Sequence, residues 1–314
     1  MGKYFVKRVL QMIPSLLIIS FAVFMIINLI DGNPAITLAG ANASEAQLQA
    51  LTEKFGLDQP LLNRYFIWLG NIFRGDMGNT LLSQQPVALM IGSRLGATVE
   101  LTLVATVLSL IISVPAGVVS ALKPNGPFDR MCTGISAFFF AVPGFWLAIM
   151  LMLIFSLTLK LLPPSGRANF LIDPVGHIKT LILPATTIAI GMAAKSVRFI
   201  RASLIEVFNE DYITTAKARG VKHRVVIYRH AIRNALIPVI TIVGLQMGDL
   251  LGGSLIIEQI FGWPGIGSLA IQAINWRDYN LLQGTVLYIV LMFMVINFIV
   301  DILHAMVDSR VRLE

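Results

Sequence analysis

Acidic side chains inside apolar stretches are the first candidates for chemistry in this sequence. Glu100, Asp249, Glu258 and Asp301 each stand within or at the edge of a long hydrophobic run. An ionised carboxylate near the centre of a bilayer costs about 2.5 to 3.5 kcal/mol on insertion scales, so such groups face protein or water. We expect Glu100 and Asp301 to be paired within the protein. Asp249 is either paired or part of a cavity wall, where it would suit an amine or a metal complex.

Asp249 and Glu258 are not expected to form one joint site. They are nine positions apart, about 2.5 turns of an α-helix, so they point to different sides. Gly252 and Gly253 between them permit a close helix contact or a kink. Asp249, Glu258 and Glu100 are therefore separate candidates for the wall of a translocation pathway.

Other kinds of reactive site are not indicated. The 4 histidines show no metal-ligand spacing, so we predict no metal site. Cys132, the 1 cysteine, is predicted to be a buried apolar residue. No nucleophile with a neighbouring base stands near an apolar run, which disfavours a membrane-embedded enzyme. The sequence has no GxxxxGK[ST] phosphate-binding loop, so it binds no ATP by that motif.

These residues must be positioned by membrane-spanning helices. Hydrophobic residues make up 56% of the chain and charged residues 13%, unlike an ordinary soluble domain. Runs of about 20 apolar residues are long enough to cross a bilayer as helices. We predict six such spans: Val9 to Ile30, Thr98 to Leu122, Met131 to Leu159, Ile178 to Arg198, Ile237 to Phe261 and Leu282 to Val307. The fourth contains Pro184, and Lys195 near its end is expected to reach the membrane interface.

The distribution of basic residues predicts the orientation. On this topology most of the 24 Lys and Arg residues fall on one side, which the positive-inside rule assigns to the cytoplasm together with both termini. This bias also explains the pI near 9.7, so nucleic-acid binding is not predicted. The first span follows Lys3, Lys7 and Arg8 but is too long for a signal peptide, and we interpret it as an uncleaved anchor.

The segment 31–97 is predicted to lie outside and to contain two amphipathic helices. Ser44 and Gln47 form a capping box for the first helix. The second runs from Pro60 to about Arg74 and ends before Gly75. We expect both helices to lie on the membrane or against the spans; a gate or a receptor contact is the alternative.

The most basic segment runs from Asp211 to Pro238 and belongs to a predicted cytoplasmic insert, which is taken as 199–236. Asp211 is predicted to cap a short helix that ends at Arg219, where Gly220 takes the left-handed conformation. A second helix is predicted from Lys222 to about Ala235, with Val225, Ile232 and Leu236 toward membrane or protein and Arg224, Arg229 and Arg233 outward. Orientation and anionic lipid alone could account for the charge. Two capped helices instead favour a docking site for a soluble partner.

The insert resembles the ATPase-coupling signature of permease subunits in ATP-binding-cassette importers. Its usual form is EAA, three residues and Gly, followed by an apolar residue shortly before Pro. The matching positions are Thr214, Thr215, Ala216, Gly220, Ile237 and Pro238. Thr214 and Thr215 depart from Glu and the first Ala of that signature, and the spacing from Gly to Pro is long.

These departures are similar to the peptide and nickel branch of the family. Its pattern in this chain comprises Tyr212, Thr215, Ala216, Lys217, Ala218, Arg219, Gly220, His230, Arg233, Asn234, Ala235 and Pro238. Further matches are FGLDQP at 55–60, RGDMGNT at 74–80, TVELTL at 98–103 and GWPGIGSLAIQAINWRDY at 262–279. Asn33 and Ser309 stand where this branch usually has Asp and Pro.

The resemblance implies an all-α, six-span permease of a bacterial or archaeal inner membrane that forms half of an import pathway. The implied partners are a second, distinct permease chain, two cytoplasmic ATPases that hold ATP and Mg²⁺, an external binding protein and membrane lipid. The solute would be a short peptide, with nickel complexes, glutathione and opines as alternatives. The ATPase-coupling residues would be Asp211, Tyr212, Thr214, Thr215, Ala216, Lys217, Ala218, Arg219, Gly220, His230 and Pro238.

The chain is accordingly divided into three parts: 1–30 with the first span, 31–97 as the external segment, and 98–314 as a five-span core with the insert. An ion- or proton-coupled secondary transporter is the alternative function. It would use the intramembrane acids directly and leave the insert as orientation charge. No internal repeat of the kind found in many secondary transporters is visible.

Overall fold

The computed structural model describes residues 2–29, 44–54, 58–222 and 225–307. Within these residues every regular element is a helix, apart from one isolated bridge between Asn79 and Pro86. The prediction of an all-α chain is confirmed. The chain divides into two compact units, residues 1–98 with 264–294 and residues 99–263 with 295–314.

Among the described residues, four helices are long and apolar enough to cross a membrane: α1 (Gly2–Leu29), α5 (Val87–Leu122), α8 (Pro174–Phe208) and α14 (Tyr279–Val307). They correspond to the first, second, fourth and sixth predicted spans. α8 begins where Asp173 accepts the N–H of Gly176 at 2.8 Å, with Pro174 in the first turn. It continues to Phe208, so Lys195 does not stand near its end as predicted.

The third predicted span is not one continuous helix. α6 (Pro127–Ala141) and α7 (Gly144–Met152), which continues as a π-helix η1 (Leu153–Thr158), meet at 98°. Val142 and Pro143 between them are extended, with ψ of 125° and 133°. Pro143 lacks an N–H and disfavours helical backbone at the residue before it, so the break falls there.

The fifth predicted span, Ile237 to Phe261, is also divided. α11 (Ile232–Gly253) ends before Ser254, and α12 (Leu255–Ile260) follows. The apolar part of α11 that the structure describes is Val239–Leu250, which is shorter than a span. In the described residues the number of candidate spans is therefore four, or five if the bent α6–α7 pair counts as one.

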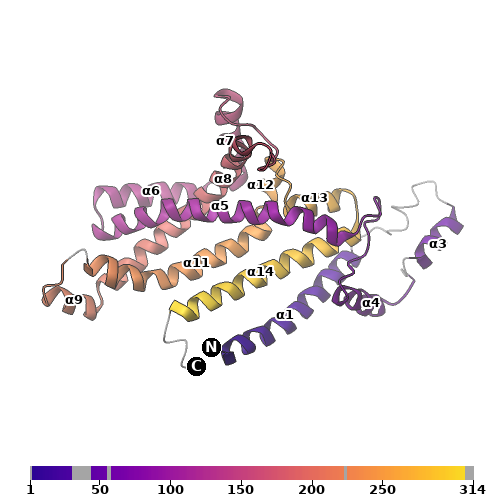
Figure 1. Cartoon of the computed structure of the whole chain (residues 1–314), viewed down its shortest axis with the longest axis horizontal. Helices are drawn as coiled ribbons and strands as arrows, with labels where there is room; N and C mark the ends of the chain where they lie inside the picture. The colour runs from indigo at the N-terminus through magenta and orange to yellow at the C-terminus, as the bar shows by residue number, and fades with distance from the viewer. Residues whose placement is uncertain (1, 30–43, 55–57, 223–224, 308–314) are drawn as a thin grey trace. The chain divides into compact units, whose positions relative to one another are not determined.

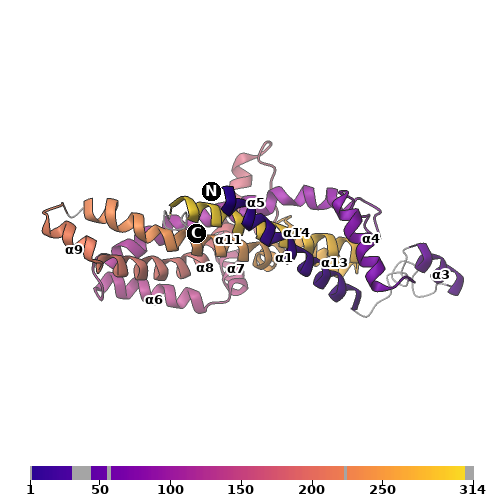
Figure 2. The same ribbon diagram turned by 90° about the horizontal axis from the view of Figure 1, so that it is seen from below.

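The larger unit is built around α8, which packs against α6, α7 and α11 (Figure 1). Small residues allow the helices to approach closely. A Cβ added at Gly117 would lie 2.7 Å from Ile200, and one added at Gly244 would lie 2.1 Å from Val300. Polar contacts add to this packing: Arg201 donates to Asp129 at the start of α6, with Nη2 and Oδ2 2.7 Å apart. α6 and α8 lie side by side in both views (Figure 2).

The two helices that were predicted for the segment 31–97 are present in the smaller unit. α3 (Glu45–Lys54) begins with the predicted capping box, in which Gln47 N–H donates to Ser44 Oγ and Ser44 N–H to Gln47 Oε1. α4 (Leu61–Phe73) packs on α1 through Tyr65, which is 5% exposed and contacts the rings of Phe21 and Phe24. The expectation that this helix packs against a span is confirmed for α4.

A buried carboxylate joins two of the motifs that are far apart in the sequence. Asp278 follows α13 (Ile266–Asn275) and accepts the N–H groups of Leu81 at 2.7 Å and Leu281 at 3.0 Å. Burial raises the pKa of the Asp278 carboxyl, and the backbone N–H groups oppose that rise. The Asp278 carboxylate thus accepts hydrogen bonds from the turn that follows RGDMGNT and from the first turn of α14. These hydrogen bonds bring RGDMGNT and NWRDY together.

Candidate functional site

The basic insert begins with a short helix, α9 (Asp211–Ala218). The N–H groups of Ile213 and Thr214 donate to the carbonyl of Glu210, the residue before the helix. Asp211 is therefore the first helical residue and places a negative charge in the first turn, whereas its prediction as the cap is wrong. The helix also ends one residue earlier than the predicted Arg219.

Gly220 ends α9 as predicted. Its φ is +75°, and the N–H of Val221 donates to the carbonyl of Ala216 at 3.2 Å. This is the hydrogen bond of a Schellman motif, which requires a residue in the left-handed conformation directly after the helix. A Cβ at Gly220 would meet no atom within 4 Å, so the requirement for glycine comes from the backbone alone.

α9 has one buried face and one exposed face. Ile213 is 0% exposed and belongs to a hydrophobic cluster that we call the anchor cluster: Ala121, Ile200, Leu204, Ile213, Val226, Ala231, Ala235 and Val239. These residues come from α5, α8, α9 and the helix after α9. The exposed residues of the segment are Asp211, Tyr212, Thr214, Thr215, Ala218, Arg219 and Gly220. α9 lies beyond the ends of α8 and α11 (Figure 1).

The second helix of the insert is not a separate element. From Val225, its first described residue, it passes through a π-helix η2 (Val226–Ala231) and continues without a break into α11. Val225 is exposed, and its predicted position toward membrane or protein stays a prediction. Val226 is buried and Ile232 packs on the anchor cluster. A π turn contains more residues than an α turn and so rotates the buried face.

Several predicted residues lie outside what the structure describes. This holds for Arg224 and for the side chains of Lys217, Arg229, His230, Arg233, Leu236 and Pro238. Their proposed contacts with a partner stay predictions.

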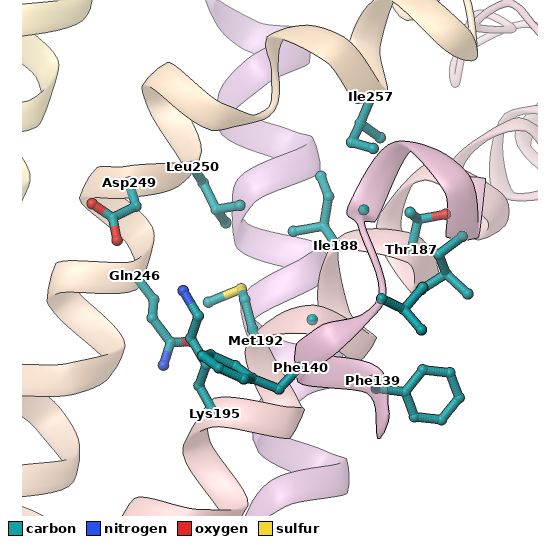
Figure 3. Close-up of a pocket in the computed structure, with 14 residues that line it drawn as sticks. Phe139, Phe140, Thr187, Ile188, Met192, Lys195, Gln246, Asp249, Leu250 and Ile257 are labelled. Carbon is teal, nitrogen blue, oxygen red and sulfur yellow. The ribbon is translucent and has the colours of Figure 1, made fainter. Parts of the chain in front are cut away.

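The bend between α6 and α7 opens a cavity of about 290 Å³. It is lined by residues of α6, α7, α8, α11 and α12, and most of them are apolar. Lys195 from α8 and Gln246 and Asp249 from α11 are its polar side chains besides Thr187. Figure 3 shows Lys195, Gln246 and Asp249 on the same side of the cavity, with the Phe140 ring beside Lys195. Asp249 thus lines a cavity, which is one of the two positions that were predicted for it from the sequence.

The other two candidate pathway acids are placed differently. Glu258 is 0% exposed, and its Oε1 accepts from Ser254 Oγ at 3.4 Å. Glu100 accepts from Arg167 Nη2 at 2.6 Å and contacts His177 Nε2. Neither residue is among those that line the cavity around Asp249. The pairing that was expected for Glu100 is confirmed.

Sequence reasoning missed the cluster around Glu100. His177 Nδ1 lies 2.7 Å from the carbonyl of Ala168, and the Arg167 guanidinium lies 5.4 Å from the ring centroid of Trp263, which is fully buried. These contacts hold the segment before α8 against α5, the helix that contains Glu100. Glu100 and His177 are 77 positions apart, so no local spacing could have linked them. Among the described residues no group of three or more His, Cys, Asp or Glu could hold a metal ion.

Comparisons with known proteins agree with this architecture. The family described as "Binding-protein-dependent transport system inner membrane component" matches residues 113–313, and "Binding-prot-dependent transport system membrane comp, N-term" matches residues 1–102. The chain is 40% identical over 308 residues to a putative peptide transport system permease protein of Brucella abortus, covering 98% of both chains. It is 40% identical over 312 residues to the glutathione transport system permease protein GsiC of Pectobacterium atrosepticum, covering 99% of both.

A solved structure shows the same fold. An inward-facing conformation of the MetNI methionine ABC transporter has a TM-score of 0.59 at 16% identity, covering 70% of this chain and 97% of that one. The family matches extend over nearly all of the sequence, and the two relatives align from end to end. This chain therefore belongs to the family of binding-protein-dependent transport system inner membrane components.

Proposed function

We propose that this chain is the permease subunit of an ATP-driven importer and forms half of the translocation pathway for short peptides. The observation that carries the proposal is α9, a short capped helix with an exposed outer face and a buried Ile213 that fastens it to the anchor cluster. The names of the relatives, which refer to peptide and glutathione transport, support the solute class.

The proposed complex contains a second, distinct permease chain, two ATPases on the cytoplasmic side and an external binding protein. The chain has six spans, with the α6–α7 pair and the region of α11–α12 as the third and fifth, and both termini are cytoplasmic. ATP and Mg²⁺ are held by the partner ATPases, because this sequence has no phosphate-binding loop of its own.

In this proposal the ATPase dimer closes on ATP and displaces α9. Because the anchor cluster joins α9 to α5, α8 and α11, the displacement reaches these helices as a rigid-body movement. α8 and α11 also line the cavity at the α6–α7 bend, so their movement changes access to it.

Uptake of labelled dialanine into proteoliposomes tests the proposal. The complete complex, with binding protein on one side and ATP on the other, is expected to take up dialanine only when ATP and the ATPase subunits are both present. An imposed proton gradient is expected to have no effect. Gradient-driven uptake by the chain without ATPases would contradict the proposal and favour the secondary transporter.

A further inference from the structure

The cavity at the α6–α7 bend contains two opposite charges that are not paired with each other. Neither Lys195 nor Asp249 forms an ion pair within 4.0 Å among the residues that the structure describes. They stand on different helices, α8 and α11, in a wall that is otherwise mainly apolar. Both residues are exposed, so water can compensate each charge while the cavity is empty. A guest that displaces this water must supply the opposite charges, because an uncompensated charge beside an apolar surface is costly.

A third polar group stands beside these charges. Gln246 is 7% exposed, and its Nε2 donates to Ser196 Oγ at 3.3 Å. Its Oε1 is buried and has no hydrogen-bond partner among the described residues. A buried acceptor without a donor costs about 1 to 3 kcal/mol, so the wall has an unfilled acceptor close to both charges (Figure 3).

The size of the cavity suits a small molecule. Its volume of about 290 Å³ is at the lower end of the range of roughly 300 to 1,000 Å³ that is usual for small-molecule sites. A guest of this size that carries one ammonium and one carboxylate group would compensate both charges of the wall at once. A simple cation would compensate only the charge of Asp249, and a simple anion only the charge of Lys195.

We propose that this cavity is a binding site for small zwitterions and that Lys195 and Asp249 select them by their two ends. Lys195 Nζ binds the guest carboxylate, Asp249 binds the guest ammonium, and an amide N–H of the guest donates to Gln246 after a rotation of that side chain. A dipeptide supplies all three groups. This proposal rests on the proposed function, because the zwitterion site defines the class of solute that the proposed translocation pathway carries.

Arg198 provides a matched control for the positive charge. It borders a second cavity of about 580 Å³ that shares Phe140 and Lys195 with the first, and its guanidinium lies 5.8 Å from the ring centroid of Phe140. Arg198 does not line the first cavity. Loss of its charge changes the potential nearby but removes no group of the proposed site.

Binding of three probes to the assembled permease and ATPase complex, without the binding protein, tests the proposal. The probes are dialanine, N-acetyl-dialanine and dialanine amide, measured by saturation-transfer difference NMR. The wild-type complex is expected to bind dialanine about fivefold more tightly than either derivative, because each derivative lacks one charge. Asp249→Asn is expected to remove the preference over N-acetyl-dialanine only, and Lys195→Gln the preference over dialanine amide only. Arg198→Gln is expected to keep both preferences.

Assembly of each variant complex is checked by size-exclusion chromatography before binding is measured. The proposal is overturned if the wild-type complex binds the three probes equally or binds none of them. It is also overturned if either variant weakens all three probes alike, which would assign the residue to packing. The proposed function fails by a different result, the absence of ATP-driven dialanine uptake by the complete complex, so the two failures are distinguishable.

Discussion

Gly220→Val is expected to lower ATP-driven uptake by at least about tenfold, whereas Gly220→Asn is expected to retain most of it. The φ of Gly220 is +75°, and a β-branched residue is strongly disfavoured in this region while asparagine adopts it more readily. Valine would therefore shift the end of α9 and lose the hydrogen bond from Val221 to Ala216. The measurement is dialanine uptake by proteoliposomes that contain equal amounts of each complex.

The asparagine variant separates the effect of backbone strain from the effect of adding a side chain at this position. Because a Cβ at Gly220 would meet no atom within 4 Å, both substitutions fit sterically and differ mainly in backbone preference. Normal uptake by the valine variant would show that the end of α9 has no part in coupling. Equal loss in both variants would show that the outer surface at this position, rather than the backbone, is what matters.

Ile213→Ala is expected to uncouple ATP hydrolysis from uptake. Truncation of a fully buried isoleucine costs about 2 to 5 kcal/mol, and Ile213 is the residue of α9 in the anchor cluster. The exposed face of α9 is unchanged, so the ATPases still bind and hydrolyse ATP. Their movement reaches α8 and α11 poorly, and the number of dialanine molecules taken up per ATP hydrolysed is expected to fall several-fold.

Ile213→Val is the matched control for this prediction. It keeps a β-branched side chain in the cluster and removes a single methylene, for which the usual cost is about 0.5 to 1.5 kcal/mol. The ratio of uptake to hydrolysis is expected to stay near that of the wild type. If Ile213→Ala reduces uptake and hydrolysis in equal proportion, the anchor cluster serves assembly and does not transmit movement.

Local signals in the sequence predicted local structure well. The capping box of Ser44 and Gln47, the left-handed Gly220 and most of the apolar helices are set by residues within a few positions of each other, and the structure contains them. The family signature around α9 was equally local. Such features depend on backbone preference and hydrogen bonds inside one turn, which a sequence pattern records directly.

The interruptions of the helices were harder to predict. Pro184 lies inside α8 without ending it, whereas Pro143 divides the third predicted span at a 98° bend. Proline removes a hydrogen bond in both places, and only the surrounding packing decides whether the helix continues. The π-helix η2 was likewise not predicted, because hydrophobic periodicity assumes regular α turns.

The site residues that come from separate helices could not be found from spacing. Lys195 was predicted at the membrane interface, and only the fold places it with Asp249 and Gln246 in one cavity. The contacts of Glu100 with Arg167 and His177 depend on the same kind of distant pairing. The sequence showed that each of these charged residues stands within or beside an apolar run, but it did not show which residues lie next to it in the fold.

The most direct test of the central claim is the accessibility of α9 in the membrane. Thr215→Cys places a thiol on the exposed face of α9, and Cys132→Ser removes the 1 native cysteine. A membrane-impermeant maleimide is applied to vesicles of both orientations, with and without the ATPase subunits. We expect labelling from the ATPase side alone and strong protection when the ATPases are bound. Labelling from the opposite side, or no protection by the ATPases, would contradict the account.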